Sequence, residues 1–138
     1  MSNSLPTVGG DNNTWGTILN DYLLVAHNQY GGAYTINSIN SSSTTSYNIG
    51  TAESSSPVAN EYFLVNCTTA NVTITLPDAT NSNFSYMVYN FKKTDTSINT
   101  ITINTTSSQT IDGTSSYVIS TAYFAVQIVS DASNWWII

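Results

Sequence analysis

The sequence predicts a mostly β protein: a small antiparallel β-sandwich or barrel with an N-terminal arm and one short amphipathic helix. Three observations support this fold class. The chain is rich in Tyr, Phe, Trp, Ile, Val and Thr, which favour strands. From residue 58 onward, apolar and polar residues alternate with the period of half-buried strands. Pro, Gly, Asn and Asp separate these segments at intervals typical of sandwiches and small barrels.

The composition limits both the size of the protein and its partners. At 138 residues there is room for one domain, or for a small domain with an arm. Charged residues make up only 7% of the chain, so the surface must be built from Ser, Thr and Asn. The formal net charge is -6 and only Lys92 and Lys93 are basic, whereas phosphate binding needs basic clusters. We therefore expect neither a nucleic acid nor an anionic membrane surface as a partner. No apolar run approaches the roughly 20 residues of a membrane span, so we expect no membrane insertion.

Residues 1–34 are predicted to form an anchoring arm and a helix. The stretch "NTWGTILNDYLLVAHNQYGG" has apolar residues at the spacing of one helical face, and the pair Gly31 and Gly32 would end the helix. A helix of this length is marginal in water unless its apolar face is buried. The expected docking residues of the arm and helix are Leu5, Val8, Trp15, Ile18, Leu19, Tyr22 and Leu23.

Residues 35–57 are mostly Ser, Thr, Asn and Gly, which predicts a linker with weak strand character around residues 47–49. The β-domain is expected at residues 58–138, with six or seven short strands. In the segment "FSYMVYNFKKT", Tyr86, Val88 and Asn90 are expected to face away from Met87, Tyr89 and Phe91. No crossover helix is available within this region, so antiparallel sheets are expected. Asp112-Gly113 and residues 131–134 are predicted turns.

No catalytic or metal-binding pattern is found in the sequence. His27 is the only histidine, and Asp21 would lie on a different face of the helix. Asp78, Asp95, Asp112 and Asp131 have turn-like contexts, which favour roles in backbone hydrogen bonding. The other carboxylates are Asp11, Asp21, Glu53 and Glu61, each isolated in the sequence. Phosphate-binding, dinucleotide and calcium motifs are missing, so we expect no enzyme, no cofactor and no metal.

Cysteine and tyrosine also have structural interpretations. Cys67 is the only cysteine, which excludes an internal disulfide and predicts a small buried residue in a strand. Aromatic residues beside Asn, Thr and Ser could form a sugar platform, although core or interface positions are favoured. The candidates are Tyr47, Tyr62, Tyr86, Tyr89, Tyr117 and Tyr123.

The segment "NWWII" places large apolar residues on both faces of a strand. Trp135 and Ile137 share one face, and Trp136 and Ile138 share the other. The strand could be covered on both sides within one subunit, or one pair could face a neighbouring subunit. We favour the second arrangement, because one face of a sandwich sheet is usually solvated. All four residues are therefore expected in the seam of a homotrimer.

Two parts of the chain resemble bacteriophage tail-fibre and virion structural proteins. The N-terminal part matches a Leu-Pro-x-Val-Gly-Gly-Asp-x-x-x-Trp-Gly-x-x-Leu-Asn pattern at Leu5, Pro6, Val8, Gly9, Gly10, Asp11, Trp15, Gly16, Leu19 and Asn20. The stretches "VTITLPDA", "KKTD", "NTITI", "QTIDGTSSYVIS" and "SDASNWWII" resemble the small β-domain that follows in such proteins. Ala132 and Ser133 precede Asn134 where the family usually has a glycine.

The resemblance implies a virion component, commonly trimeric. We expect a non-enzymatic phage structural protein, made in the host bacterial cytoplasm and located in the virion. A chain of this length is short for a tail fibre, so a trimeric capsid-decoration, cement or head-fibre protein is preferred. The alternative is a short tail-fibre or receptor-binding module that recognises host surface glycans. A secreted polysaccharide-active enzyme is a weaker third class. The expected partners are further copies of the chain, other virion proteins of the capsid shell or tail and, in the alternative, host glycans.

Overall fold

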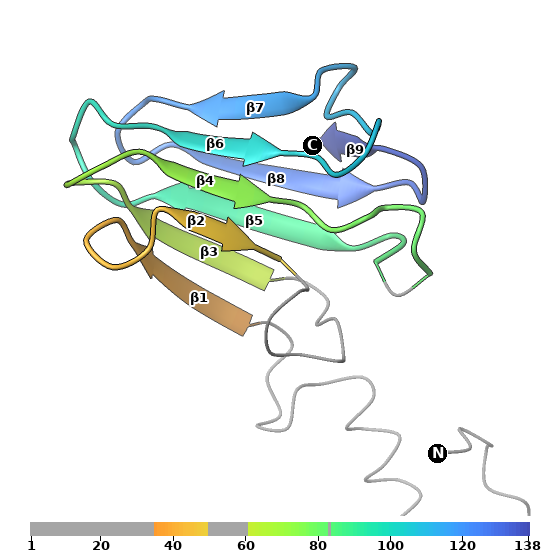
Figure 1. Ribbon diagram of the computed structural model, residues 1–138, viewed down its shortest axis with the longest axis horizontal. Helices are drawn as coiled ribbons and strands as arrows, with labels where there is room; N and C mark the ends of the chain where they lie inside the picture. Colours follow the sequence, from red (N-terminus) through yellow and green to blue (C-terminus); the bar gives the residue numbers. More distant parts are fainter. Residues whose placement is uncertain (1–34, 50–60, 83) are drawn as a thin grey trace, which may run out of the picture.

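The computed structural model describes residues 35–49, 61–82 and 84–138. The predicted arm and helix, with all seven docking residues, lie outside the described residues. Within these ranges the chain forms nine strands in two packed layers (Figure 1). The mostly β class and the sandwich form are therefore confirmed.

The two layers are a five-stranded sheet and a four-stranded sheet. The five-stranded sheet has the order β1 (Thr35–Asn40), β3 (Glu61–Asn66), β5 (Val88–Lys93), β8 (Ala125–Ser130) and β9 (Trp135–Ile137). The four-stranded sheet has the order β2 (Ser46–Asn48), β4 (Val72–Thr75), β6 (Ile101–Asn104) and β7 (Ser116–Ile119).

The chain alternates between the sheets and so builds three stacked coils, β1–β2, β3–β4 and β5–β6. Strands β1, β3 and β5 pair in parallel, and so do β2, β4 and β6. Only the pairings that involve β7, β8 and β9 are antiparallel. The predicted antiparallel arrangement is therefore wrong for six strands, because each parallel crossover runs through the opposite sheet and needs no helix.

Two predicted boundaries also change. Residues 35–49, expected to be a linker with weak strand character only around residues 47–49, form both β1 and β2. Ile39 and Ile49 from this segment are buried in the core. The strand expected from residue 84 begins only at Val88, because Tyr86 has a φ of 62°, which a strand does not allow. From Val88 to Phe91 the two faces alternate as predicted, with Tyr89 and Phe91 buried.

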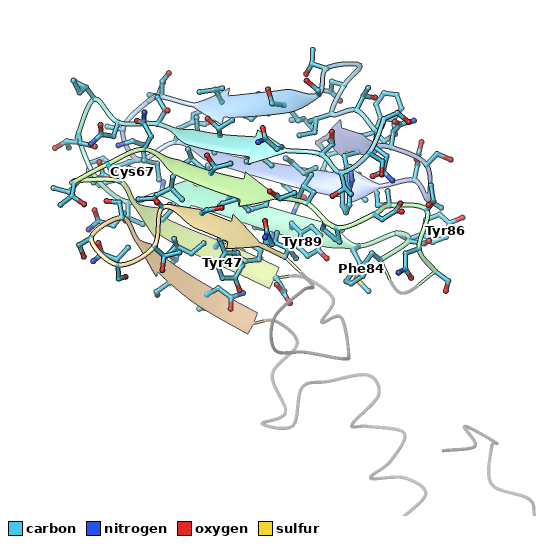
Figure 2. The ribbon with its side chains drawn as sticks, in the orientation of Figure 1. Tyr47, Cys67, Phe84, Tyr86 and Tyr89 are labelled. Carbon is cyan, nitrogen blue, oxygen red and sulfur yellow. The ribbon has the colours of Figure 1, made fainter. Side chains whose placement is uncertain are left out.

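The core is built from residues that stack from one coil to the next. Phe63 and Phe91 are register partners and lie parallel, with their ring centroids 5.1 Å apart. Tyr89 also contacts Trp135, at 5.6 Å between ring centroids, so the antiparallel strands join the same core. Figure 2 shows Tyr47 and Tyr89 near each other at the middle of the sandwich, while Cys67 and Tyr86 lie at opposite ends.

The bends that lead from the five-stranded to the four-stranded sheet share one device. A side-chain oxygen accepts a hydrogen bond from the backbone N–H two residues later, from Ser42 to Asn40 (3.1 Å) and from Thr68 to Asn66 (2.9 Å). In the third coil, Asp95 accepts from the N–H of Ser97 (2.8 Å). Asn and Asp stabilise tight turns in this way, so they set where each coil changes sheet.

Both predicted turns are present in the antiparallel part. Asp112 and Gly113 have φ values of 46° and 84°, the left-handed conformation of a two-residue hairpin turn, with Ile111 and Thr114 hydrogen-bonded across it. At residues 131–134 the N–H of Asp131 donates to the carbonyl of Asn134 (3.1 Å). In this second turn Ala132 has a φ of 73°.

Candidate interaction surface

Four aspartates were predicted to accept backbone hydrogen bonds in turns, and all four do so in the structure. Asp78 accepts from the hydroxyl and the N–H of Thr80 (2.7 and 2.9 Å), and Asp131 accepts from the N–H groups of Asn134 and Ser133 (2.7 and 2.8 Å). These hydrogen bonds hold the pKa of each of the two carboxyls below its usual value. Asp112 lies in its hairpin turn and accepts from the N–H of Ile137 (3.1 Å).

The fourth aspartate, Asp95, belongs to a buried cluster at the bend of the third coil. Lys93 lies on the inward face, in register with Val65, and its ammonium donates to the Asp95 carboxylate at 2.5 Å. The same carboxylate accepts from the N–H of Cys67 at 2.6 Å. Burial raises the pKa of Asp95, but hydrogen bonds from Lys93, Ser97 and Cys67 outweigh burial and hold the pKa well below its usual value.

Cys67 is fully buried, as predicted, but it lies directly after β3 and not within the strand where it was expected. Burial, together with the nearby Asp95 carboxylate, raises the pKa of its thiol. Since the thiolate is the reactive form, we expect little reaction with thiol reagents in the native state.

In the described part of the chain, no three His, Cys, Asp or Glu side chains gather as metal ligands would. No helix in that part has the length and apolar character needed to cross a membrane. His27, Asp11, Asp21 and Glu53 lie outside the described residues.

The outer face of the four-stranded sheet is mostly polar. Its outward positions form two cross-strand rows whose members share register, and all but one carry a hydroxyl or an amide. The exception is Val118 on the edge strand β7. The rows are Ser46, Thr73, Thr102 and Val118, and Asn48, Thr75, Asn104 and Ser116. Such a face is compatible with water.

The outer face of the five-stranded sheet is instead largely apolar. Its large exposed apolar residues lie on β1, on β3, and on β9 or directly after it. We call this set the outer apolar face: Ile36, Tyr62, Leu64, Trp136 and Ile138. Five of the ten exposed large hydrophobic residues of the described chain thus gather on one side, which is unusual for a monomer.

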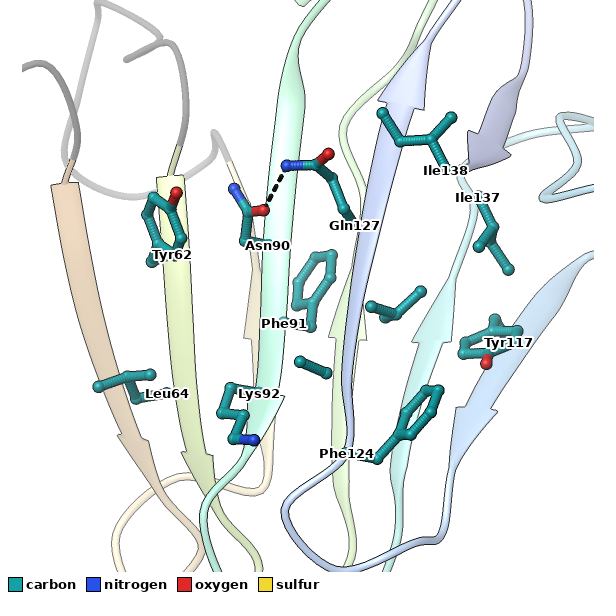
Figure 3. A pocket seen from close by; sticks show the side chains of 12 residues that line it. Tyr62, Leu64, Asn90, Phe91, Lys92, Tyr117, Phe124, Gln127, Ile137 and Ile138 are labelled. Carbon is teal, nitrogen blue, oxygen red and sulfur yellow. Dashed lines mark hydrogen bonds between the residues drawn. The ribbon is translucent and has the colours of Figure 1, made fainter.

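A groove of about 640 Å³ crosses the outer apolar face and bends around the edge of β8 (Figure 3). Tyr62 and Leu64 line one end, while Phe124 and Tyr117, which come from different sheets, lie at the other. Between them, the side chain of Gln127 donates to that of Asn90 at 2.6 Å. The groove therefore combines aromatic surface with a pair of amides.

The last strand has the two faces that the sequence predicted. Trp135 is fully buried and donates its indole N–H to Gln109 (3.3 Å), and Ile137 is packed against the core. Trp136 and Ile138 are on the opposite face and are 45% and 68% exposed. The indole N–H of Trp136 donates to Asp131 (2.7 Å), which fixes the exposed ring. One apolar pair thus fills the core and the other faces outward.

The structure separates the six candidate tyrosines. Tyr47 and Tyr89 pack in or against the core, each with an edge contact to Phe63. Tyr62 and Tyr117 line the groove, while Tyr86 and Tyr123 are exposed at positions of positive φ. Sequence reasoning placed the apolar pair of the last strand, but it missed the groove. Residues of β3, β5, β7 and β8 line the groove. No local pattern in the sequence shows that these strands come together in space.

Neither a comparison with protein-family models nor a search of curated proteins found a match for this chain. The short motifs that resemble phage proteins have structural roles here. Lys93 and Asp95 of "KKTD" form the buried ion pair, and Asp112 and Gly113 of "TIDG" form the hairpin turn. Asn134 of "SNWW" accepts from the N–H of Thr110 at 2.9 Å.

Proposed function

We propose that the chain is a non-enzymatic structural protein of a bacteriophage virion, a trimeric capsid-decoration, cement or head-fibre protein docked by its N-terminal arm. The contrast between the two outer faces of the sandwich carries this proposal. One face is covered by hydroxyls and amides, whereas the other exposes Trp136, Ile138, Tyr62 and Leu64. A protein with so few charged residues is poorly protected against association through such a face.

In this proposal the outer apolar face is the seam between subunits. Its members lie on β1, β3 and β9, so a neighbouring copy would cover the sheet from one edge to the other. At the last strand, Trp136 and Ile138 are the residues that would contact the neighbouring copy. Trp135 and Ile137, on the other side of the strand, pack in or against the core and hold the strand in place. Three such head-to-tail contacts close a ring and leave no exposed seam.

Two measurements test this function. Sedimentation of the full chain is expected to show a trimer, and the Trp136→Ser variant is expected to shift toward monomer with unchanged circular dichroism. Val118→Ser, on the opposite sheet face, is the matched control and should remain trimeric. In purified phage particles, deletion of residues 1–34 should prevent incorporation. A monomeric wild-type chain, or normal incorporation of the truncated chain, would contradict the proposal.

A short tail-fibre or receptor-binding module is the second candidate, and the groove supports it. Aromatic rings with adjacent amides can stack on and hydrogen-bond to sugars, and Tyr62, Phe124, Asn90 and Gln127 supply both. Copy number separates the two candidates: hundreds of copies per particle indicate the capsid and a handful indicate the tail. Glycan binding that is lost in Phe124→Ala, with sedimentation unchanged, would favour the second candidate.

A further inference from the structure

A polar pocket of about 410 Å³ lies at one end of the sandwich. Three loops line it, residues 78–80 after β4, residues 107–109 after β6 and residues 133–134 in the turn between β8 and β9. Every side chain of the lining carries a hydroxyl, an amide or a carboxylate. None of these residues belongs to the groove or to the outer apolar face, so the pocket is separate from both surfaces.

The wall of the pocket is anchored in the core by Gln109, which is buried. Its Oε1 accepts from the N–H of Ala79 (3.1 Å) and from the indole N–H of Trp135 (3.3 Å), and its Nε2 donates to Oδ1 of Asp78. The hydroxyl and the N–H of Thr80 donate to the same Oδ1, at 2.7 and 2.9 Å. These contacts hold the Asp78 carboxylate in one orientation before any ligand arrives.

Several polar groups of the lining have no hydrogen bond within the part of the chain that the structure describes. Oδ1 of Asp78 takes all of the hydrogen bonds to that carboxylate, and its Oδ2 takes none. In Asn134, Oδ1 accepts from the N–H of Thr110 (2.9 Å), whereas Nδ2 donates to no described group. Three lining hydroxyls also have no such partner, those of Ser107, Ser108 and Ser133. The pocket therefore offers an acceptor, a donor and three groups that can act as either.

Charge narrows the class of ligand. Asp78 is the only ionisable residue of the lining, and hydrogen bonds from Thr80 and Gln109 hold its pKa below the usual value, so it is ionised at neutral pH. The two lysines of the chain, Lys92 and Lys93, lie at the opposite end of the sandwich, where β5 passes the start of β8 (Figure 1). A cationic ligand is therefore attracted to the pocket and an anionic one is repelled.

A sugar ring with a free amino group meets both conditions. Its ammonium would form a charge-assisted hydrogen bond with the carboxylate, which is stronger than a bond between neutral groups. Its hydroxyls would use the serines and the amide, whereas a simple alkylammonium such as a lysine side chain would leave them unused. The volume of the pocket also falls within the range of about 300–1,000 Å³ that is usual for small-molecule sites.

We propose that this pocket binds a hexosamine with a free amino group. The ammonium contacts Oδ2 of Asp78, and the ring hydroxyls contact Asn134 and the three lining serines. This site goes beyond the proposed virion role, because binding here needs neither a trimer nor a particle. It is also distinct from the groove on which the second candidate function depends.

The probe is glucosamine, titrated into the full chain and followed by amide and indole NMR. We expect saturable shifts of the Thr80 amide and of the Trp135 indole N–H, because that indole bonds Gln109, which in turn bonds Asp78. The amide of Cys67, at the other end of the sandwich, is the internal control and should not shift (Figure 2). Glucose and N-acetylglucosamine lack the charge, and butylamine lacks the hydroxyls, so each should bind at least about tenfold more weakly.

Variants of the chain separate a specific site from general attraction to a negative protein. Asp78→Asn keeps an oxygen for Thr80 and Gln109 but replaces Oδ2 with an amide, so it should weaken glucosamine binding at least about tenfold. Glu61→Gln removes a carboxylate at the same end of the sandwich but outside the pocket, and it should bind as the wild type does. Leu64→Ser, in the proposed subunit seam, should also bind normally, so a failed trimer model leaves this inference standing.

Absence of saturable glucosamine binding to both the wild type and Leu64→Ser overturns the inference. Equal binding of glucosamine by the wild type and by Asp78→Asn, with unchanged circular dichroism, also overturns it. If Asp78→Asn does not fold, the comparison of ligands on the wild type decides alone. Glucose or butylamine that binds as tightly as glucosamine would show that the pocket does not recognise an amino sugar.

Discussion

Single polar side chains hold most of the bends in this fold. Asn40, Asn66 and Asp95 each accept a backbone N–H where a coil leaves the five-stranded sheet, and Asp78 and Asp131 do so in other turns. Because each of them satisfies a backbone donor locally, the chain can turn sharply without a glycine-rich loop. The abundance of Asn, Ser and Thr is thus partly a property of the turns.

Ala132 is predicted to be a strained residue of the last turn. Its φ of 73° lies in the left-handed region, where a Cβ costs about 1–2 kcal/mol. Ala132→Gly is expected to stabilise the protein by about 0.5–1 kcal/mol, because relief of strain exceeds the added freedom of the unfolded chain. Urea unfolding measures the change. The control is Ala125→Gly at a strand position in β8, which should lower the free energy of unfolding. The prediction would be contradicted if Ala132→Gly lowered the free energy of unfolding by the same amount.

The buried Lys93–Asp95 pair predicts a specific dependence of stability on pH. The folded pKa of Asp95 lies below its unfolded value, so the ionised carboxylate stabilises the fold. This contribution is present above the unfolded pKa of about 4 and is lost as the pH falls through the folded pKa. The free energy of unfolding should therefore decrease below about pH 4.

Two variants test the role of this pair. Asp95→Asn leaves the Lys93 ammonium buried without its counter-ion and should cost about 3–5 kcal/mol at neutral pH. Its stability should also fall less steeply in acid, although Asp78 and Asp131 keep some pH dependence. Adding Lys93→Met should restore part of the loss. Urea unfolding from pH 2 to pH 7, roughly the range of carboxyl titration, measures the stability of both variants. If the free energy of unfolding of Asp95→Asn fell with acid as steeply as that of the wild type, the ion pair would not be the source of the pH dependence.

At the level of strands, the sequence predicted positions and faces better than pairing. The alternation of apolar residues with threonines in β4 and β6 correctly identified the buried sides, because a side-chain period of two is a local property. Strand direction is not local. The coil repeat that pairs Asn40 with Asn66 and Phe63 with Phe91 differs in length and composition between coils, so it leaves no regular period to detect.

Strand β9 gives the clearest test of face assignment. Trp135 is fully buried against Tyr89, so Trp135→Ser should cost about 3–5 kcal/mol and unfold a marginally stable domain. Trp136→Ser removes an exposed ring and one hydrogen bond to Asp131, so the strand content should persist. Circular dichroism with urea unfolding compares the two. Similar losses of stability would mean that the two faces of β9 are not distinct.

For the whole molecule, the three coils and the antiparallel strands share one core. Ile39 and Ile49 of the first coil, Phe63 of the second and Trp135 of the last strand all belong to the same buried cluster. Composition predicted a surface of hydroxyls and amides, and the outer face of the four-stranded sheet fits that expectation. It could not predict that apolar residues from β1, β3 and β9 would gather on the other face, since that depends on strand order.

The position of the domain boundary is the last prediction. The sequence alone places the boundary at residue 58, whereas the structure includes residues 35–49 as the first coil. A chain of residues 35–138 should unfold cooperatively, with every core residue of the described part retained. A chain of residues 58–138 loses Ile39 and Ile49, worth about 1.5–3 kcal/mol each when buried. It also loses the Tyr47 contact with Phe63 and leaves β3 as an unpaired edge.

The shorter chain should therefore be less stable by several kcal/mol and prone to associate through β3, since an exposed edge strand templates further pairing. Urea unfolding and sedimentation of the two truncations give the comparison directly. Equal stability would mean that the first coil adds nothing to the domain and that the boundary indeed lies at residue 58. A large difference would establish the parallel coil stack, rather than the antiparallel strands alone, as the folding unit.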